Sequence, residues 1–240
     1  MLSELYRRPS DLPRQIPVFP LRGTILLPRA VLPLNIFEPR YLAMLDEVIA
    51  GNRLLGILQP ERGADRFEID DDEPGGAVEA PEMDDVDLRK VGCLGRVTGF
   101  QELDDGRLMI TLTGVARFRV IDEPVSGRPF RICNIDCDEF AVDLDEGMGE
   151  EEVDRETLLR VLKTYLSTHN LNADWHAITK ASTEFLVNSL SVVSPYGPEE
   201  KQALLEAGDL KTRAEVLVAL AEMELASGGD GSGSGGSTLQ

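Results

Sequence analysis

Positive charge is scarce in this chain of 240 residues, where 24 Lys and Arg residues stand against 43 Asp and Glu residues and the formal net charge is −19. A nucleic-acid binder needs a positive footprint for phosphates, so this balance argues against one. The sequence also lacks any run of 18 apolar residues, which excludes a membrane-spanning helix. Its first residues lack the apolar stretch of a secretory signal, and its three cysteines do not demand an oxidising compartment. We therefore expect a cytoplasmic protein.

The signatures of catalysis and of metal binding are missing as well. The sequence contains no G-x-S-x-G elbow, no H-E-x-x-H or C-x-x-C motif and no G-x-x-x-x-G-K-[ST] phosphate loop. Cys133 and Cys137 would lie about 13 Å apart on one strand, too far for a disulfide, and are interpreted as buried apolar fillers. The two histidines are His169 and His176, and a pair of Cys93 with His176 stays open because such groups assemble across a fold. We expect no catalytic residue, no metal and no cofactor.

The negative charge is concentrated in two segments. Residues 61–87 hold twelve acidic residues and two arginines, and residues 138–156 hold ten acidic residues and one arginine. The rest of the chain is neutral. We interpret both segments as solvated connections whose charges repel one another. The alternative is an acidic arm for a basic partner or a metal, although no EF-hand pattern is present.

The first half of the chain carries the pattern of a β-rich domain. Prolines interrupt residues 16–37 so often that a helix is excluded and edge or bulged strands are favoured. A helix is expected to begin at Pro39 and to end at Gly51. Strands are expected over residues 53–59, 90–101, 107–121 and 130–137, and Asp105-Gly106 is a type I′ hairpin signal. One inserted helix among these strands predicts a small closed or nearly closed barrel.

Within the predicted strand 107–121, alternation assigns each side chain to a face. Phe118 and Val120 should point inward, whereas Arg117 and Arg119 should point outward. With other arginines of the strands, these could form a local basic patch.

The period changes from strand to helix near residue 152. One face of a first helix is formed by Leu158, Leu159, Leu162, Tyr165 and Leu166. Asp174 is expected to be the N-cap of a second helix, which Pro195 breaks and which carries Ile178, Phe185, Leu186 and Leu190. Pro198 opens a third helix, and Asp209 caps a fourth. The expected organisation is a β-barrel followed by a helical bundle, an α+β fold. Its parts are an N-terminal extension (1–14), the barrel (15–138) with its acidic, flexible loop (61–87), an acidic linker (139–153), the bundle (154–226) and a Gly/Ser-rich flexible tail (227–240).

Five blocks, in the same order, resemble the Lon protease N-terminal (LON substrate-binding) domain. They cover most of residues 14–226 and comprise Ile16–Pro28, Leu32–Tyr41, Val91–Arg96, Asp105–Arg119 and Glu199–Glu206. The resemblance implies a pseudouridine-synthase-and-archaeosine-transglycosylase (PUA)-like barrel followed by a helical bundle. A complete Lon protease also carries a Walker A ATPase and a Ser–Lys protease domain, and neither is in this sequence. The resemblance therefore implies a stand-alone, non-catalytic relative of that domain.

In the family this domain recognises protein substrates and helps assembly. The resemblance thus implies a protein-binding module, which recognises exposed segments of client proteins or acts as an adaptor or regulator of a separate ATP-dependent protease. Self-association is left open. A nucleic-acid-binding PUA-like protein and an enzyme with an unrecognised site remain as alternatives.

The binding surface is expected where the Pro-rich strands meet the barrel rim. Alternatively, Ile36 and Phe37 are core residues and Glu38 pairs with Arg40 for structural reasons. Alternation places Ile36 and Phe37 on opposite faces, so at most one of them reaches any given site. The candidate protein-binding residues are Leu32, Leu34, Ile36 and Phe37, with Arg40 or Arg96 at the polar edge.

Overall fold

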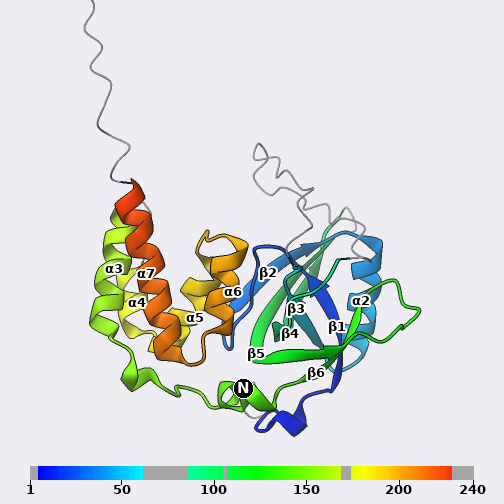
Figure 1. Cartoon of the computed structure of the whole chain (residues 1–240). Coiled ribbons are helices and arrows are strands. Elements are labelled where there is room, and N and C mark those ends of the chain that lie inside the picture. Colours follow the sequence, from blue (N-terminus) through cyan, green and yellow to red (C-terminus); the bar gives the residue numbers. More distant parts are fainter. Residues whose placement is uncertain (1–4, 62–85, 105–106, 169–173, 229–240) are drawn as a thin grey trace, which may run out of the picture.

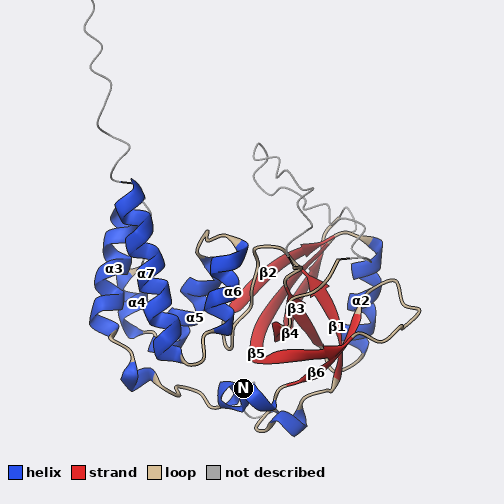
Figure 2. Cartoon of the chain, viewed as in Figure 1, coloured by secondary structure: helices blue, strands red, loops and turns tan. Residues whose placement is uncertain are grey.

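The computed structural model describes residues 5–61, 86–104, 107–168 and 174–228 (Figure 1). In Figure 2 the strands lie on the right, most helices lie on the left, and two short 3-10 helices lie along the path that joins them. The elements are η1 (Pro9–Asp11), β1 (Gln15–Pro20), β2 (Val31–Ile36), α2 (Pro39–Ala50), β3 (Leu54–Leu58), β4 (Val91–Glu102), β5 (Leu108–Asp122), β6 (Ile132–Asp136), η3 (Asp138–Leu144), η4 (Glu150–Glu152), α3 (Arg155–Thr168), α4 (Trp175–Lys180), α5 (Thr183–Val193), α6 (Pro198–Glu206) and α7 (Leu210–Gly228).

The six strands form one mixed sheet in the order β2-β5-β4-β3-β1-β6. β5 also pairs with β6, so five strands curl into a ring and β2 lies outside it. β1 changes partner at its middle: Gln15–Pro17 pairs antiparallel with β6, and Val18–Pro20 pairs parallel with β3. The expected barrel is therefore present only as a curled mixed sheet with an extra strand, not as a clean barrel.

Two apolar clusters fill the molecule. One lies against the ring of strands and includes Ile16, Leu94 and Phe118, whose ring packs where a Cβ on Gly56 would otherwise stand. The other is larger and runs from α2 across the opposite face of β2, β4 and β5 to the helices. Because the second cluster includes residues of both halves, such as Leu112 and Leu205, the sheet and the helices share one core.

Most expected elements of the first half are confirmed. α2 begins at Pro39 and has Gly51 as its C-cap residue, and β3 to β6 occupy the predicted ranges within two residues. Pro33 stands in β2, an edge strand, which is where proline is tolerated in a sheet. β1, by contrast, is paired along both halves and is not an edge strand. The turn predicted at residues 105–106 lies outside the described residues.

In the helical half, one predicted helix is two helices. Asp174 caps its helix as expected, with its side chain accepting from the backbone N–H groups of His176 and Ala177. That helix, α4, ends at Lys180, and Ser182 then caps α5 by accepting from the N–H of Phe185. Local capping by Ser182 thus outweighs the continuous apolar period. Phe185, one of the apolar residues that the predicted helix carries, is exposed.

Of the two acidic segments, residues 62–85 lie outside the described residues. The other does not form the solvated connection expected from its charge. Phe140, Asp143, Leu144 and Val153 are buried, and η3 packs on β5. One of its carboxylates has a specific internal partner, which explains why this segment lies against the body of the protein.

That partner is Arg117, expected to point outward toward solvent. It does lie on the face opposite Phe118, but η3 and the end of α6 cover this face, and Arg117 is 2% exposed. The Asp143 carboxylate accepts three hydrogen bonds from Arg117: from the backbone N–H (2.9 Å), from Nε (2.8 Å) and from Nη2 (2.8 Å). The Nη1 of Arg117 donates to the carbonyl oxygens of Leu205 (3.2 Å) and Ala207 (2.6 Å) at the C-terminal end of α6. Arg117 therefore joins the sheet, η3 and the helices.

Further buried polar contacts join the same parts. Asn188 of α5 donates to the carbonyl of Pro28 (3.0 Å) and accepts from Arg213 of α7 (2.9 Å). Gln202 of α6 donates to the carbonyl of Val91 on β4 (3.2 Å). Each of these polar groups is paired, as burial requires. In the parts of the chain that the structure covers, no helix is both long and apolar enough to cross a membrane.

We predict that Arg117→Met lowers the free energy of unfolding by about 3–5 kcal/mol, because Asp143 then stays buried without its cation. Removing both charges, in Arg117→Met with Asp143→Leu, should restore part of the loss. Urea unfolding followed by circular dichroism measures both. Arg119→Met is the matched control, since its pair with Glu139 lies at the surface and should contribute little. Equal losses at positions 117 and 119 would contradict this account.

Candidate functional site

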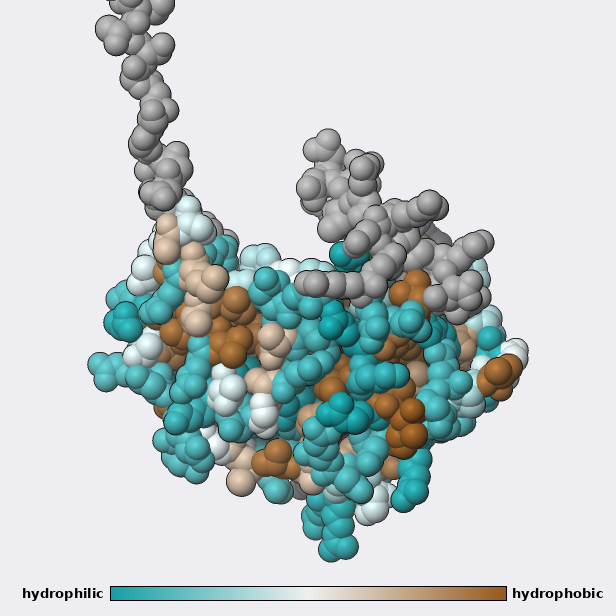
Figure 3. Space-filling model, in the orientation of Figure 1, coloured by the Kyte–Doolittle hydropathy of each residue, from teal (hydrophilic) through white to brown (hydrophobic). Residues whose placement is uncertain are grey.

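An apolar hollow lies between three helices in the described part of the chain. α3, α5 and α7 form its walls, the turn after α5 closes one side, and its volume is about 390 Å³. In Figure 3 apolar atoms gather on the helical side of the molecule, among hydrophilic surroundings. We call this hollow the helical groove; it is lined by Leu158, Val161, Leu162, Tyr165, Leu166, Leu190, Val193, Ser194, Pro195, Tyr196, Leu217, Val218, Ala221 and Glu224.

Spacing along the helices explains why these side chains share a wall. On α3, residues 158, 161, 162 and 165 follow the three- and four-residue repeat of one helical face. On α7, Val218, Ala221 and Glu224 do the same, and the small Ala221 leaves space. Pro195 ends α5 and turns the chain so that Tyr196 reaches the groove. The groove is thus a helix–helix contact that the side chains do not fill.

Arg155 fixes how α3 meets the neighbouring helices. Its guanidinium donates to the carbonyl oxygens of Thr179 (3.2 Å) and Ala181 (2.8 Å) at the end of α4, and to Oγ1 of Thr183 (2.9 Å) at the start of α5. A cation at a helix C-terminus also interacts favourably with the helix dipole. One side chain therefore sets the first turn of α3 against α5, on the opposite wall of the groove.

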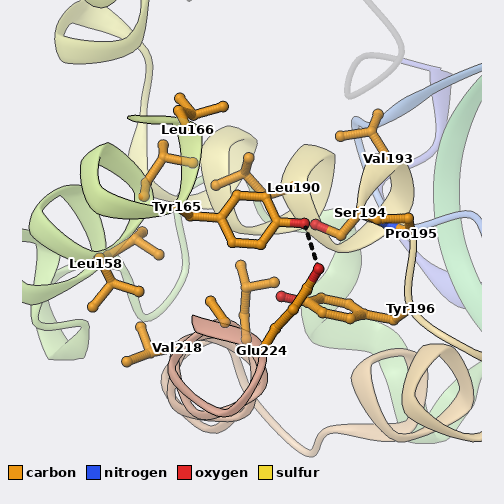
Figure 4. Close-up of a pocket in the computed structure, with 14 residues that line it drawn as sticks. Leu158, Tyr165, Leu166, Leu190, Val193, Ser194, Pro195, Tyr196, Val218 and Glu224 are labelled. Carbon is orange, nitrogen blue, oxygen red and sulfur yellow. Dashed lines mark hydrogen bonds between the residues drawn. The ribbon is translucent and has the colours of Figure 1, made fainter. Parts of the chain in front are cut away.

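The polar groups of the groove meet at one place. In Figure 4 the hydroxyl of Tyr165 points toward Ser194 and Glu224, and it donates to Oε1 of Glu224 (3.3 Å). Burial raises the pKa of Tyr165, and the negative charge of Glu224 raises it further. Burial raises the pKa of Tyr196 to about 12. Both phenols therefore stay protonated at neutral pH and can donate, whereas Glu224 is the one charged group among the lining residues.

The apolar residues predicted to bind a partner, three on β2 and Phe37 directly after it, are partly covered. Leu32 and Ile36 belong to the larger core and are 9% and 1% exposed. Leu34 packs against the same core but is half-buried, and Phe37 is half-buried too. Leu32, Leu34 and Ile36 share one face of β2, as alternation requires. The role of all four in binding stays a prediction, and only Leu34 and Phe37 are accessible enough to contact a partner.

The two arginines placed at the polar edge lie apart. Arg40 pairs with Glu38 (2.9 Å), which is the structural ion pair considered as an alternative. The Arg40 guanidinium also lies 4.8 Å from the centre of the Tyr41 ring. Arg96 donates to the Tyr6 hydroxyl (2.7 Å) and to the carbonyl of Asn52 (2.8 Å). Val97 next to it faces the larger core, so Arg96 lies on the opposite face from Leu32 and Ile36. The structure therefore does not bring Arg96 together with the β2 residues.

The open pairing of Cys93 with His176 is wrong. Cys93 is fully buried, and its thiol donates to the carbonyl of Leu94 (3.5 Å). His176 is exposed on α4. His169 lies outside the described residues. All three cysteines are free and buried, which confirms Cys133 and Cys137 as apolar fillers. Among the described residues there is no cluster of three or more His, Cys, Asp or Glu side chains that could hold a metal ion.

The arginines of the strands do not form the basic patch considered from the sequence. Arg117 pairs with Asp143 (2.8 Å), Arg119 with Glu139 (2.7 Å), and Arg128 with Glu47 (2.8 Å). Arg131 pairs with Glu123. Acidic side chains thus neutralise most of the positive charge on the strands.

Sequence reasoning missed the helical groove. Tyr165 was assigned to the apolar face of its helix, which is correct, but a periodic face does not show whether its neighbours fill the space beside it. Glu224 did leave a signal, because it stands three residues after Ala221, on the inward face of α7. A charged residue on an apolar helix face is unusual enough to mark a site.

Comparison with known proteins identifies the family to which the chain belongs. Residues 15–222 match the ATP-dependent protease La (LON) substrate-binding domain. The chain belongs to this family, which confirms the resemblance seen in the sequence.

Relatives of known sequence are Lon proteases. The chain is 26% identical over 220 residues to the Lon protease of Flavobacterium johnsoniae, covering 90% of this chain and 25% of that protein. It is 24% identical over 217 residues to Lon protease 2 of Myxococcus xanthus, covering 88% and 24%. The chain thus spans about a quarter of the length of these relatives.

Two solved structures share the fold. One is the Lon N-terminal domain protein from Xanthomonas campestris, with a TM-score of 0.56 and 22% identity over 85% of this chain and 97% of that chain. The other is the N-terminal domain of the Mycobacterium avium complex Lon protease, with a TM-score of 0.58 and 17% identity over 87% and 98%. Both are N-terminal Lon domains, so the mixed sheet and its helices are the fold of that domain.

We predict that the three thiols make the protein less stable in alkali. Burial raises the pKa of Cys133 and Cys137 from 9.0 to about 12, and raises that of Cys93 further. Between pH 9 and 12 the unfolded chain therefore ionises first, and the free energy of unfolding should fall by up to about 1.4 kcal/mol per pH unit for each thiol. The stabilisation is complete below pH 9.

Urea unfolding of the wild type and of Cys133→Ala across this pH range measures the difference in slope. A thiol reagent should label the native protein far more slowly than a free cysteine peptide. Rapid labelling of the native protein, or an unchanged slope in the variant, would show that the thiols are accessible.

Proposed function

We propose that this chain binds exposed segments of client proteins, and that such a segment places apolar side chains in the helical groove. The observation that carries the proposal is the groove itself, an apolar hollow of about 390 Å³ open at the surface of a protein from the LON substrate-binding family. Burying one large apolar side chain contributes about 1.5–3 kcal/mol. Two or three such side chains would give the weak, reversible binding that a substrate receptor needs.

A second contact on the sheet accompanies the groove in this proposal. Leu34 and Phe37 are half-buried at the edge strand, where an extended segment can lie along the sheet. Arg40, three residues after Phe37, is partly exposed, and in this proposal it meets the polar backbone of the segment. The ring of five strands supports the proposal that the β-rich part is PUA-like. The chain changes from strands to helices at about residues 139–153, which supports a division into two parts there.

We further propose that the chain itself is non-catalytic and serves a Lon-type ATP-dependent protease as adaptor or regulator in the cytoplasm. The family match covers the substrate-binding domain, about a quarter of each relative. Cys93, the cysteine considered from the sequence as a catalytic nucleophile, is buried. Binding to a nucleic acid is less favoured, because Arg117, Arg119 and Arg128 are paired with carboxylates.

Filling the groove tests the main proposal. Ala221→Trp places a large side chain in the groove and should weaken binding of a permanently unfolded, reduced and carboxymethylated protein by about tenfold, the loss of roughly 1.4 kcal/mol of apolar contact. Fluorescence anisotropy with the labelled unfolded protein gives the dissociation constants. The native form of the same protein should not bind.

Ala226→Trp is the matched control, because Ala226 is exposed on the same helix and does not line the groove. It should bind as the wild type does. If both variants bind equally well, the groove is not the site, and Leu34→Asp then tests the sheet edge in the same assay.

A further inference from the structure

We propose that the helical groove selects client segments in which a basic side chain, Lys or Arg, stands next to the apolar side chain that enters the groove. This inference rests on the proposed function and adds the chemistry of the segment. Its basis is Glu224, which places one carboxylate on a wall that is otherwise apolar or hydroxylic.

The lining residues make the charge of the groove unambiguous. Of the 14 residues that line it, 13 are uncharged at neutral pH, and none is Lys, Arg or His. A cation that enters the groove would therefore meet the negative charge of Glu224, and none of the 14 lining residues would repel it. An acidic side chain would meet repulsion in surroundings of low polarity, where charge interactions are stronger than in water.

Aromatic rings flank the carboxylate. Figure 4 shows the Tyr196 ring beside Glu224 and the Tyr165 hydroxyl directed at it, and that hydroxyl holds Oε1 (3.3 Å). The hydrogen bond orients the carboxylate before a ligand arrives. A carboxylate accompanied by tyrosine rings suits an ammonium or guanidinium group, because the ring faces attract cations as well.

The geometry of α7 sets the spacing of the two side chains on the client. Ala221 on the groove wall and Glu224 differ by three residues, about 4.5 Å along a helix axis. In a client helix, residues three or four apart lie about 5–6 Å from each other, and in an extended client residues two apart lie about 7 Å apart. A Lys or Arg at either spacing can keep its aliphatic stem against apolar surface while its charged end reaches Glu224.

The net charge of −19 would attract basic segments without any groove, so the test must separate Glu224 from bulk charge. Three peptides serve as probes, identical except for Lys, Gln or Glu at the position four residues after a central Leu in a helical sequence. Dissociation constants are measured by fluorescence anisotropy with the full chain at about 0.1 M salt, where charges beyond about 10 Å are screened.

For the wild type we expect the Lys peptide to bind about tenfold more tightly than the Gln peptide, which corresponds to roughly 1.4 kcal/mol, and the Glu peptide to bind most weakly. Glu224→Gln should abolish the preference for Lys and leave the Gln peptide within about twofold. Glu222→Gln removes the same charge from an exposed position of the same helix that does not line the groove, so it should keep the preference.

The charge reversal Glu224→Lys should invert the order, with the Glu peptide binding best. Thermal unfolding confirms that each variant is folded, and the reversal keeps the test decisive if Glu224→Gln does not fold. A preference for Lys that persists in Glu224→Gln, or falls equally in Glu222→Gln, would overturn the inference.

The two proposals fail in different ways. Equal binding of the Lys and Gln peptides, with both weakened by Ala221→Trp, refutes the selection of basic residues and leaves the groove as the binding site. Binding of all three peptides that Ala221→Trp does not change refutes the proposed function itself.

Discussion

The arrangement of the whole molecule depends on one buried ion pair, Arg117 with Asp143. Arg117 comes from the middle of the longest strand, and Asp143 from the segment that leaves the sheet. The guanidinium also binds carbonyl oxygens at the end of α6. Desolvating these charges is costly, and the cost is offset only when all the hydrogen-bonding positions are satisfied together. The pair therefore favours one position of the helices on the sheet over the many that apolar contact alone would allow.

This constraint reaches the groove through α5 and α7. Asn188 of α5 links Pro28, in the loop before β2, to Arg213 of α7. The Lys201 ammonium of α6 donates to the carbonyls of Ser191 (2.8 Å) and Val192 (2.6 Å), at the end of α5 next to the groove. These hydrogen bonds hold α5, α6 and α7 at fixed positions relative to one another. On the other side the apolar faces of α3, α5 and α7 diverge enough to leave a hollow.

A receptor for segments of many proteins needs affinity without detailed shape matching. An apolar groove supplies this, because the hydrophobic effect is non-directional and scales with buried area. A single carboxylate adds a preference at modest cost, since a wrong partner loses one charge interaction rather than the whole contact. The family assigns the class of protein, and the proposed choice of clients rests on the groove with Glu224.

The sequence by itself determined the local elements: α2 begins at Pro39 and has Gly51 as its C-cap, Asp174 and Asp209 cap their helices, and the strand ranges follow from alternation. These elements depend on contacts between residues that are close in the chain, so the local sequence is enough to predict them. Tertiary structure decided the rest. Alternation put Arg117 on the outer face of its strand, but only the packing of η3 and α6 made that face interior. Likewise, the period of α3 and α7 assigned their apolar faces, but whether those faces fill the space between them depends on helix separation, which long-range contacts set.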